Sequence, residues 1–236
     1  MNAAIVGATG LVGSAMLKML IELQRYKCVF VIGRRQPQWL SQYAEAPKQS
    51  QQTLVVFIKA EIADFPNLEL DEPIDTLYCA LGTTIKQAGS QEAFIAVDKT
   101  AIIDIASRVI QMNPNANKLV LVSAHGANAE SKVFYNRIKG ETEQAVIALG
   151  YQHVVILRPS LLLGKRSETR ILEDIGQSAS RYLAPIFRGP LLTVKPIEHQ
   201  QVAAAMLYFS MHAQQSVEIV SNKQMHLLAD KLAAFS

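Results

Sequence analysis

The sequence predicts an α/β protein: a doubly wound parallel sheet with helices on both faces and a small C-terminal extension on the substrate side. Two observations favour this class. Short continuous apolar runs alternate with segments of helical periodicity along the first two-thirds of the chain, as expected for parallel strands that are buried on both faces and joined by helical crossovers. A glycine-rich turn also separates the first apolar run from the first amphipathic segment.

Six apolar runs are the expected strands, and three amphipathic segments are the expected helices between them. The strands are expected at residues 3–7, 28–32, 54–59, 76–80, 118–123 and 153–157, and the helices at 11–24, 91–113 and 133–149. Residues 36–52 are rich in Gln, Ser, Ala and Pro, and are expected as a short helix or loop on the surface.

The alternation weakens after Pro159, where Gly, Pro and charged residues are mixed with apolar ones. We expect residues 160–196 to form a lid over the substrate side, because this segment is too small to be an independently stable domain. The whole chain, residues 1–236, is therefore predicted to be a single domain.

The composition excludes several classes of protein. Half of the 236 residues are hydrophobic and 18% are charged, with a formal net charge of +3, which is typical of a protein with a substantial core. The basic residues form no run that would indicate a nucleic-acid or membrane partner. Cys28 and Cys79 lie in apolar runs and are expected as buried thiols. Neither they nor the five histidines have metal-ligand spacing, so no metal is expected.

The expected location follows from missing signals. No apolar stretch approaches the ~20 residues that span a bilayer. The first residues run directly into a strand pattern, which leaves no room for a signal peptide. We therefore expect a cytoplasmic protein.

The turn after the first strand has the spacing GxxGxxG, and it predicts a dinucleotide site. Glycines there allow a tight bend, a close approach of the backbone to pyrophosphate, and packing of the helix on the strand. The helix that follows offers free N–H groups and a partial positive charge to the anion. The expected cofactor contacts in this turn are Gly7, Thr9, Gly10, Leu11, Val12 and Gly13.

The residues after the second strand indicate which dinucleotide is bound. An NAD site usually places an acid there for the ribose 2′-hydroxyl, whereas an arginine accommodates a 2′-phosphate. At this place the chain has Arg34 and Arg35 and no acidic residue. Guanidinium groups bind phosphate in a bidentate way. We therefore expect NADP(H), the alternative being two solvated loop arginines.

Two further segments are expected near the cofactor. The small residues Ala80, Leu81 and Gly82 follow the fourth strand, where a cofactor passes close to the backbone. Asp64 follows the third strand at a place from which it could reach the adenine, although it could equally cap a helix.

Three residues predict the chemistry. Ser123 ends the fifth strand, and Tyr135 and Lys139 are four residues apart in the helix that follows, so both share one helix face. A nearby cation lowers the pKa of a tyrosine, which favours Tyr135 as a general acid or base. Lys139 could also bind the cofactor ribose, and Ser123 could hold the substrate oxygen. Asp98 is expected either to orient the site or to decorate a helix.

In these motifs the chain resembles the short-chain dehydrogenase/reductase superfamily. The segments GATGLVG, SAHG at Ser123, YNRIKGETE at Tyr135 and the Arg158-Pro159 step cover the first two-thirds of the chain. GRR after the second strand, CALGTT after the fourth, Val97-Asp98, and RPSLLLGKR after the sixth are similar to the atypical members related to the Tat-interacting protein and to small epimerase-like NAD(P)-binding proteins.

The resemblance implies a Rossmann fold, NADP(H) in the crevice with Pro159 among its contacts, and Ser123, Tyr135 and Lys139 as the catalytic triad. The tail is shorter than in sugar-nucleotide epimerases, which disfavours a nucleotide-sugar substrate. The leading expectation is an NADPH-dependent oxidoreductase acting on a small carbonyl or alcohol that the sequence leaves unidentified. The alternative is an NADPH-binding regulatory module with a protein partner, because the branch includes proteins that act through partners. Monomer and homodimer both stay open.

Overall fold

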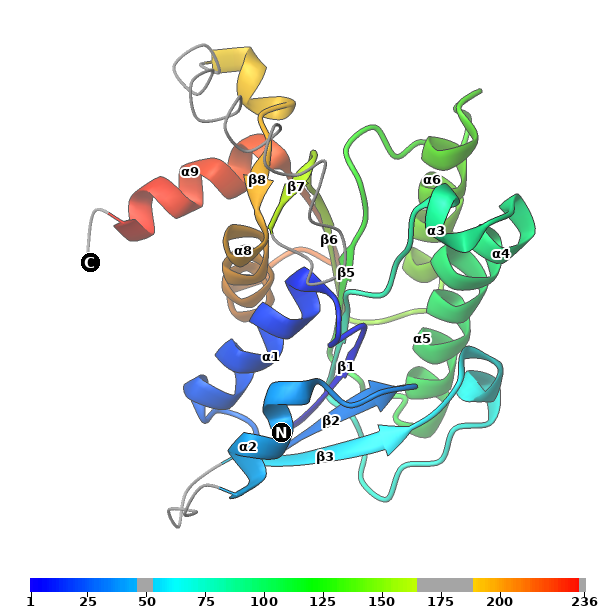
Figure 1. The fold of residues 1–236 in the computed structure, drawn as a ribbon, viewed down its shortest axis with the longest axis vertical. Coiled ribbons are helices and arrows are strands. Elements are labelled where there is room, and N and C mark those ends of the chain that lie inside the picture. The colour runs from blue at the N-terminus through cyan, green and yellow to red at the C-terminus, as the bar shows by residue number, and fades with distance from the viewer. Residues whose placement is uncertain (46–52, 165–188, 234–236) are drawn as a thin grey trace.

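The computed structural model describes residues 1–45, 53–164 and 189–233, and Figure 1 shows the fold. The main sheet has seven strands in the order β3-β2-β1-β4-β5-β6-β9, and every neighbouring pair is parallel. The strands are β1 Asn2–Val6, β2 Cys28–Gly33, β3 Leu54–Lys59, β4 Thr76–Cys79, β5 Lys118–Val122, β6 His153–Arg158 and β9 Val217–Ser221. The predicted fold class is confirmed.

Helices cover both faces of this sheet (Figure 1): α1 and α8 pack on one face and α5 and α6 on the other. The helices are α1 Leu11–Leu23, α2 Gln38–Glu45, α3 Ile85–Ala88, α4 Gln91–Ile95, α5 Ala101–Met112, α6 Phe134–Ile147, α8 His199–His212 and α9 Asn222–Ala233. Shorter elements are the 3-10 turns Ile62–Asn67 and Gly189–Thr193, the π turn Ala96–Thr100, and the strands β7 Leu162–Leu163 and β8 Ile197–Glu198, which pair with each other.

The apolar runs of the sequence become strands that are buried on both sides. In β1, Ala3 and Ile5 face the cluster formed with α1 and α8, whereas Ala4 and Val6 face the cluster formed with α5. None of these four side chains has exposed surface. A strand between two helical layers has no solvated face, and therefore its sequence lacks the alternation of half-buried strands.

The structure departs from the predicted elements in several places, and it adds the short elements α3, β7, β8 and the two 3-10 turns. The helix expected at 91–113 is interrupted by the π turn Ala96–Thr100, in which the N–H of Ala101 donates to the carbonyl of Ala96. The strand β9 and the helix α9 were not predicted; in β9, Glu218 interrupts the apolar run that marks the other strands. Of the predicted lid, residues 165–188 lie outside the described part of the chain.

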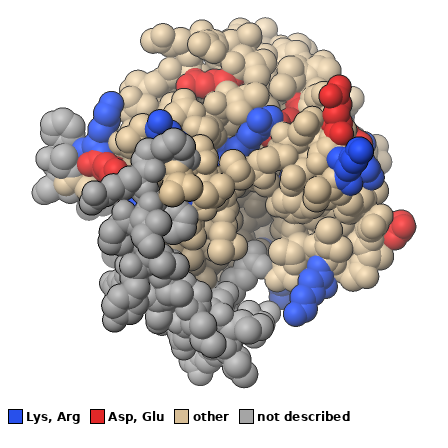
Figure 2. Space-filling model, turned by 90° about the horizontal axis from the view of Figure 1, so that it is seen from above, with Lys and Arg blue, Asp and Glu red and all other residues tan. Residues whose placement is uncertain are grey.

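The carboxyl-end face of the molecule carries scattered charges of both signs, with no cluster of one sign on its described residues (Figure 2). Within the described ranges, no helix is long and apolar enough to cross a membrane. The same residues contain no group of three or more His, Cys, Asp or Glu side chains placed to share a metal ion.

Candidate functional site

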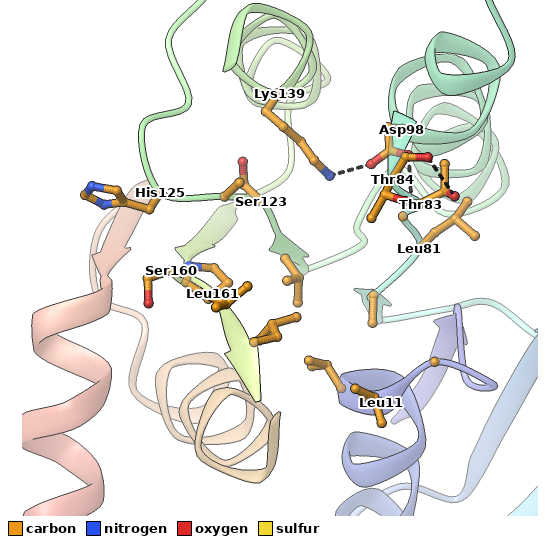
Figure 3. Close-up of a pocket in the computed structure, with 18 of the residues that line it drawn as sticks. Leu11, Leu81, Thr83, Thr84, Asp98, Ser123, His125, Lys139, Ser160 and Leu161 are labelled. Atoms are coloured by element: carbon orange, nitrogen blue, oxygen red, sulfur yellow. Dashed lines mark hydrogen bonds and ion pairs between the residues drawn. The ribbon is translucent and has the colours of Figure 1, made fainter. Parts of the chain in front are cut away.

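A cavity of about 690 Å³ opens at the carboxyl ends of the central strands, the edge at which parallel α/β sheets bind their ligands. Its wall comes from the start of α1, from the loops after β4, β5 and β6, and from α6. Figure 3 shows these residues converging on one space from segments that are far apart in the sequence. The volume lies within the range of ordinary ligand pockets.

The glycine turn between β1 and α1 has no room for side chains at two of its positions. Gly7 has φ +81°, and a Cβ built on it would lie 2.4 Å from the carbonyl oxygen of Ala80. A Cβ on Gly13 would lie 2.2 Å from the carbonyl oxygen of Gly7. The N–H of Gly10 donates to the same oxygen at 2.9 Å and closes the turn. The backbone of the turn can therefore approach a pyrophosphate at the start of α1.

A second, smaller cavity of about 100 Å³ lies on the other side of this turn. Arg34 and Arg35 line it from the end of β2, together with Thr9, Ala60 and Ile62. Both arginines are exposed, and Arg34 Nε lies 3.8 Å from a carboxylate oxygen of Glu61, which is also exposed. An exposed pair at this distance binds weakly, so Arg34 stays available to an anion.

Ser123 and Tyr135 both line the large cavity. Ser123 is 6% exposed, and its hydroxyl has no hydrogen-bond partner among the described residues. The Tyr135 ring packs against Phe94, with ring centres 5.5 Å apart. Burial raises the pKa of Tyr135, while the Lys139 cation lowers it and the Asp98 carboxylate raises it. The expected lowering by Lys139 is therefore outweighed by burial, and Tyr135 is a neutral phenol at neutral pH.

Lys139 reaches across the cavity wall toward Asp98 (Figure 3), and its Nζ lies 2.7 Å from Asp98 Oδ1. Neither side chain is more than 6% exposed. The other carboxylate oxygen of Asp98 accepts the N–H of Thr83 at 2.8 Å. Burial raises the pKa of Asp98, and the contacts with Lys139 and Thr83 oppose that rise. The ion pair joins α6, the π turn and the loop after β4.

Helix α6 is fixed against its neighbours by two close contacts. A Cβ on Gly140 would lie 2.1 Å from the backbone nitrogen of Ala129, so this glycine lets α6 touch the loop after β5. Glu143, nearly buried, forms a bidentate pair with Arg158 at 3.0 Å and 2.5 Å, which ties α6 to the end of β6. A bidentate guanidinium–carboxylate pair fixes the relative orientation of its two side chains. This pair therefore fixes α6, which carries Tyr135 and Lys139, relative to the end of β6.

The far wall of the cavity is held by Asn222, the first residue of α9. Its side chain is buried, accepts the N–H of Ser160 at 3.0 Å and donates to the carbonyls of Leu192 and Lys195, each at 2.8 Å. The two segments to which the Asn222 side chain is hydrogen-bonded include the cavity residues Leu161, Leu162 and Val194. An element absent from the predictions therefore supports the site.

Replacing Asn222 by alanine should lower the free energy of unfolding by about 2 kcal/mol, because buried backbone groups lose their partners. The melting temperature should fall by about 4–8 °C for a chain of this size. Thermal denaturation checks this, with the exposed Asn115→Ala as the control. A melting temperature equal to that of the control would show that Asn222 does not hold the wall.

The predicted cofactor residues lie in three places. Gly10, Leu11, Val12, Ala80, Leu81, Gly82, Lys139 and Pro159 line the large cavity, and Gly7, Thr9, Arg34, Arg35 and again Leu81 line the small one. Gly13 lines neither and packs under the turn. Asp64 also lies outside both linings. Its carboxylate accepts the N–H of Glu61 at 2.7 Å, in a capping box at the start of the turn Ile62–Asn67.

Thr83 and Ile62 line the cavities but were not among the predicted site residues, and two roles were left open for Asp98. A signal for Asp98 is present in the sequence: it lies on the apolar stripe of the helical segment, four residues from the fully buried Phe94 and Ile102. A charge on a buried stripe needs a partner.

The described residues fit a dinucleotide cofactor. The glycine turn is a cradle that a Cβ would fill, and the Ser123 hydroxyl is a buried polar group without a hydrogen-bond partner in the part of the chain that the structure describes. Such groups in native proteins are normally satisfied, and a ligand in the cavity would supply the partner of Ser123.

Comparison with known proteins places these features in a family. Residues 2–147 match the family described as semialdehyde dehydrogenase, NAD binding domain. The protein FMP52, mitochondrial, of Candida albicans is 31% identical over 214 residues, covering 89% of this chain and 88% of that protein. The protein of the same name from Emericella nidulans is 35% identical over 177 residues, covering 75% of this chain and 73% of that protein. These names state no activity.

Solved structures share the fold at low sequence identity. A short-chain type dehydrogenase/reductase from Mycobacterium ulcerans superimposes with a TM-score of 0.67 at 15% identity, covering 95% of this chain and 89% of that one. MoeE5 in complex with UDP-glucose and NAD gives a TM-score of 0.66 at 13% identity, covering 99% of this chain and 82% of that one. The chain thus shares with these structures the doubly wound Rossmann-type fold.

One prediction is wrong in the light of these relatives. A cytoplasmic protein was expected, but the curated relatives are named as mitochondrial proteins. The expectation rested only on the lack of targeting features in the sequence, and such a lack indicates no compartment.

Proposed function

The chain belongs to the semialdehyde dehydrogenase NAD-binding domain family and to the family of the fungal FMP52 proteins, and from this premise we propose that it is an NADPH-dependent oxidoreductase of the atypical short-chain dehydrogenase/reductase type. The observation that carries the proposal is the single cavity that brings Ser123, Tyr135 and Lys139 to the glycine turn. The substrate is a small carbonyl compound or the corresponding alcohol.

Each part of the cofactor has candidate residues. The turn Gly7–Gly13 and the start of α1 would hold the pyrophosphate, Arg34 and Arg35 the 2′-phosphate, and Lys139 the ribose next to the nicotinamide. When bound, the cofactor supplies or accepts the hydride.

The chain's own residues move the proton. The Ser123 hydroxyl has no hydrogen-bond partner within residues 1–45, 53–164 and 189–233, and it would donate to the substrate oxygen and so orient that oxygen toward Tyr135. In the direction of reduction, the Tyr135 phenol gives its proton to that oxygen as negative charge develops on it. The phenol is protonated at neutral pH, which is the form that reduction requires, and burial raises the pKa of Tyr135 further.

A route through a thiol adduct on an aldehyde is not supported by the residues. Such a route needs a thiolate at the cavity, whereas both Cys28 and Cys79 are buried in strands and line neither cavity. Burial raises the pKa of Cys79 to about 12. The Ser123 and Tyr135 route is therefore the proposed one.

The preference for NADPH over NADH should depend on the two arginines. Arg34→Ala and Arg35→Ala should each weaken NADPH binding by about 10-fold or more, since a hydrogen bond to a charged group contributes roughly 1.5–3 kcal/mol, and should leave NADH binding nearly unchanged. Titrations that follow cofactor fluorescence measure both affinities. Arg25→Ala, at an exposed position outside both cavities, is the control. Equal losses for both cofactors would refute a 2′-phosphate site.

The second candidate is an NADPH-binding module whose output is a protein contact. It is favoured by relatives whose names give no activity. The two functions separate in one measurement on the purified protein: NADPH oxidation over a panel of aldehydes and ketones. Tight NADPH binding with no turnover of any carbonyl would favour the module.

A further inference from the structure

One side of the large cavity has no part in the proposed cofactor site or in the proton transfer. It is formed by Leu161 and Leu162, which follow β6, and by Val194, which precedes β8. These three side chains are 70%, 36% and 46% exposed. Single exposed apolar side chains are common on proteins, but three that line one cavity form an apolar surface that a ligand can cover. We call these three residues the apolar wall.

The two leucines of the apolar wall are held at the cavity by the pairing of two short strands. β7 pairs with β8, with Leu162 opposite Ile197, and the N–H of Ile197 donates to the carbonyl of Leu161 at 2.9 Å. Figure 3 shows Leu161 across the cavity from Asp98. Because these hydrogen bonds fix the backbone, the leucine side chains stay at the cavity. The apolar wall is therefore preorganised for an apolar ligand.

The charges of the cavity are already paired with each other. Lys139 is the one ammonium or guanidinium group, and Asp98 the one carboxylate, among the described residues that line the large cavity, and they lie 2.7 Å apart. His125 also lines the cavity, but Figure 3 shows its ring directed away from Ser123. A carboxylate or phosphate on a substrate would therefore lose hydration without gaining an unpaired cation, which is unfavourable.

We propose that the substrate is an uncharged aliphatic aldehyde or ketone whose hydrocarbon chain lies on the apolar wall, and that Leu161, Leu162 and Val194 determine this preference. The inference rests on the proposed function and names the substrate class of that same site. Reduction of hexanal, for example, takes a hydride from NADPH and a proton from Tyr135, and yields 1-hexanol and NADP⁺. The Tyr135 phenol then regains its proton from water.

A matched pair of substrates tests the preference for an uncharged chain. Hexanal and 6-oxohexanoate have chains of the same length and the same aldehyde, but 6-oxohexanoate ends in a carboxylate. We expect kcat/KM for hexanal to be higher by about 10- to 100-fold, because the carboxylate must be desolvated at the apolar wall. The methyl ester of 6-oxohexanoate is the control for size and should regain most of the rate. Initial rates of NADPH oxidation measure all three.

Two outcomes of this comparison would overturn the inference. The first is a kcat/KM for 6-oxohexanoate that equals or exceeds that for hexanal, because the cavity would then accept a charged chain. The second is a methyl ester that is reduced as slowly as the acid, because the size of the end group, and not its charge, would then decide the rate.

Chain length tests the apolar wall itself. Each methylene that leaves water should raise kcat/KM by up to about fourfold, so propanal, butanal, pentanal and hexanal should form a rising series. The double variant Leu161→Ser/Val194→Ser removes two exposed side chains of the wall and should flatten this series. Leu232→Ser, at an exposed position of α9 outside both cavities, is the control and should keep the slope. A flat series in the unaltered protein, or an unchanged slope in the double variant, would reject the inference.

Failure of the proposed function is distinguishable from failure of this inference. If neither aldehyde nor any other carbonyl compound is reduced, the proposed function fails, and binding decides which ligand the cavity accepts. Hexanamide and 6-amino-6-oxohexanoate are unreactive carbonyl compounds that differ only in the terminal carboxylate. Hexanamide alone should raise the melting temperature of the protein saturated with NADPH. Equal rises with both compounds, or no rise with hexanamide, would overturn the inference.

Discussion

Tyr135→Phe should lower the rate of carbonyl reduction by about 10²–10⁴-fold, the usual contribution of a positioned general acid, while the affinity for NADPH stays close to that of the unaltered protein. Phenylalanine keeps the ring that packs against Phe94 and removes only the hydroxyl that gives the proton. Initial rates of NADPH oxidation and a fluorescence titration measure the two quantities separately.

Tyr151→Phe is the matched control for this variant. The Tyr151 hydroxyl is buried and donates to the carbonyl of Ala106 at 2.8 Å, and it does not line the cavity. This control should lose about 1 kcal/mol of stability with the hydrogen bond and keep its turnover. Retained turnover in Tyr135→Phe would refute the assigned proton transfer.

The role of the Tyr135 phenol as a proton donor leads us to expect a rate of carbonyl reduction that depends on pH. Burial holds the pKa of Tyr135 above the ordinary value of about 10. A group that must be protonated works below its pKa, so the rate of reduction should stay level through neutral pH and fall only as the pH rises through this raised value. A fall centred near pH 7 would assign the proton to another group.

Gly13→Ala and Gly10→Ala should both abolish most NADPH binding, but for different reasons. The Gly13 methyl would lie 2.2 Å from the Gly7 carbonyl oxygen and must distort the turn, which should lower stability by about 1–3 kcal/mol. The Gly10 methyl would lie 3.3 Å from that oxygen and needs only a small shift. It should instead occupy the space of the pyrophosphate.

The two variants should lose NADPH affinity alike but differ in melting temperature. Each variant should lose about 10- to 100-fold in NADPH affinity for each backbone hydrogen bond to phosphate that is lost, but only Gly13→Ala should show a clearly lower melting temperature. Unchanged affinity in Gly10→Ala would mean that the cofactor does not approach this turn, and the proposed function would lose its foundation.

Much of this site is local and could be predicted from the sequence. The glycine turn needs only residues that follow one another between a strand and a helix, and Tyr135 and Lys139 need only helical spacing. Pairings between distant segments could not be predicted in this way. The contact of Asp98 with Lys139 depends on how the π turn packs against α6, and the clamp of Asn222 on Ser160 depends on a strand and a helix that carry a weak pattern.

The sequence by itself determined the sheet class, six of the seven parallel strands and the glycine turn, and it predicted the three residues of the proposed chemistry, because hydrophobic periodicity and short motifs are properties of neighbouring residues. Only the tertiary structure decided the direction in which the pKa of Tyr135 shifts, the partner of Lys139 and the support of the cavity wall. Burial and ion pairing arise when segments far apart in the chain pack together, and at Tyr135 the cost of burying charge outweighs the nearby cation that the helix alone would suggest.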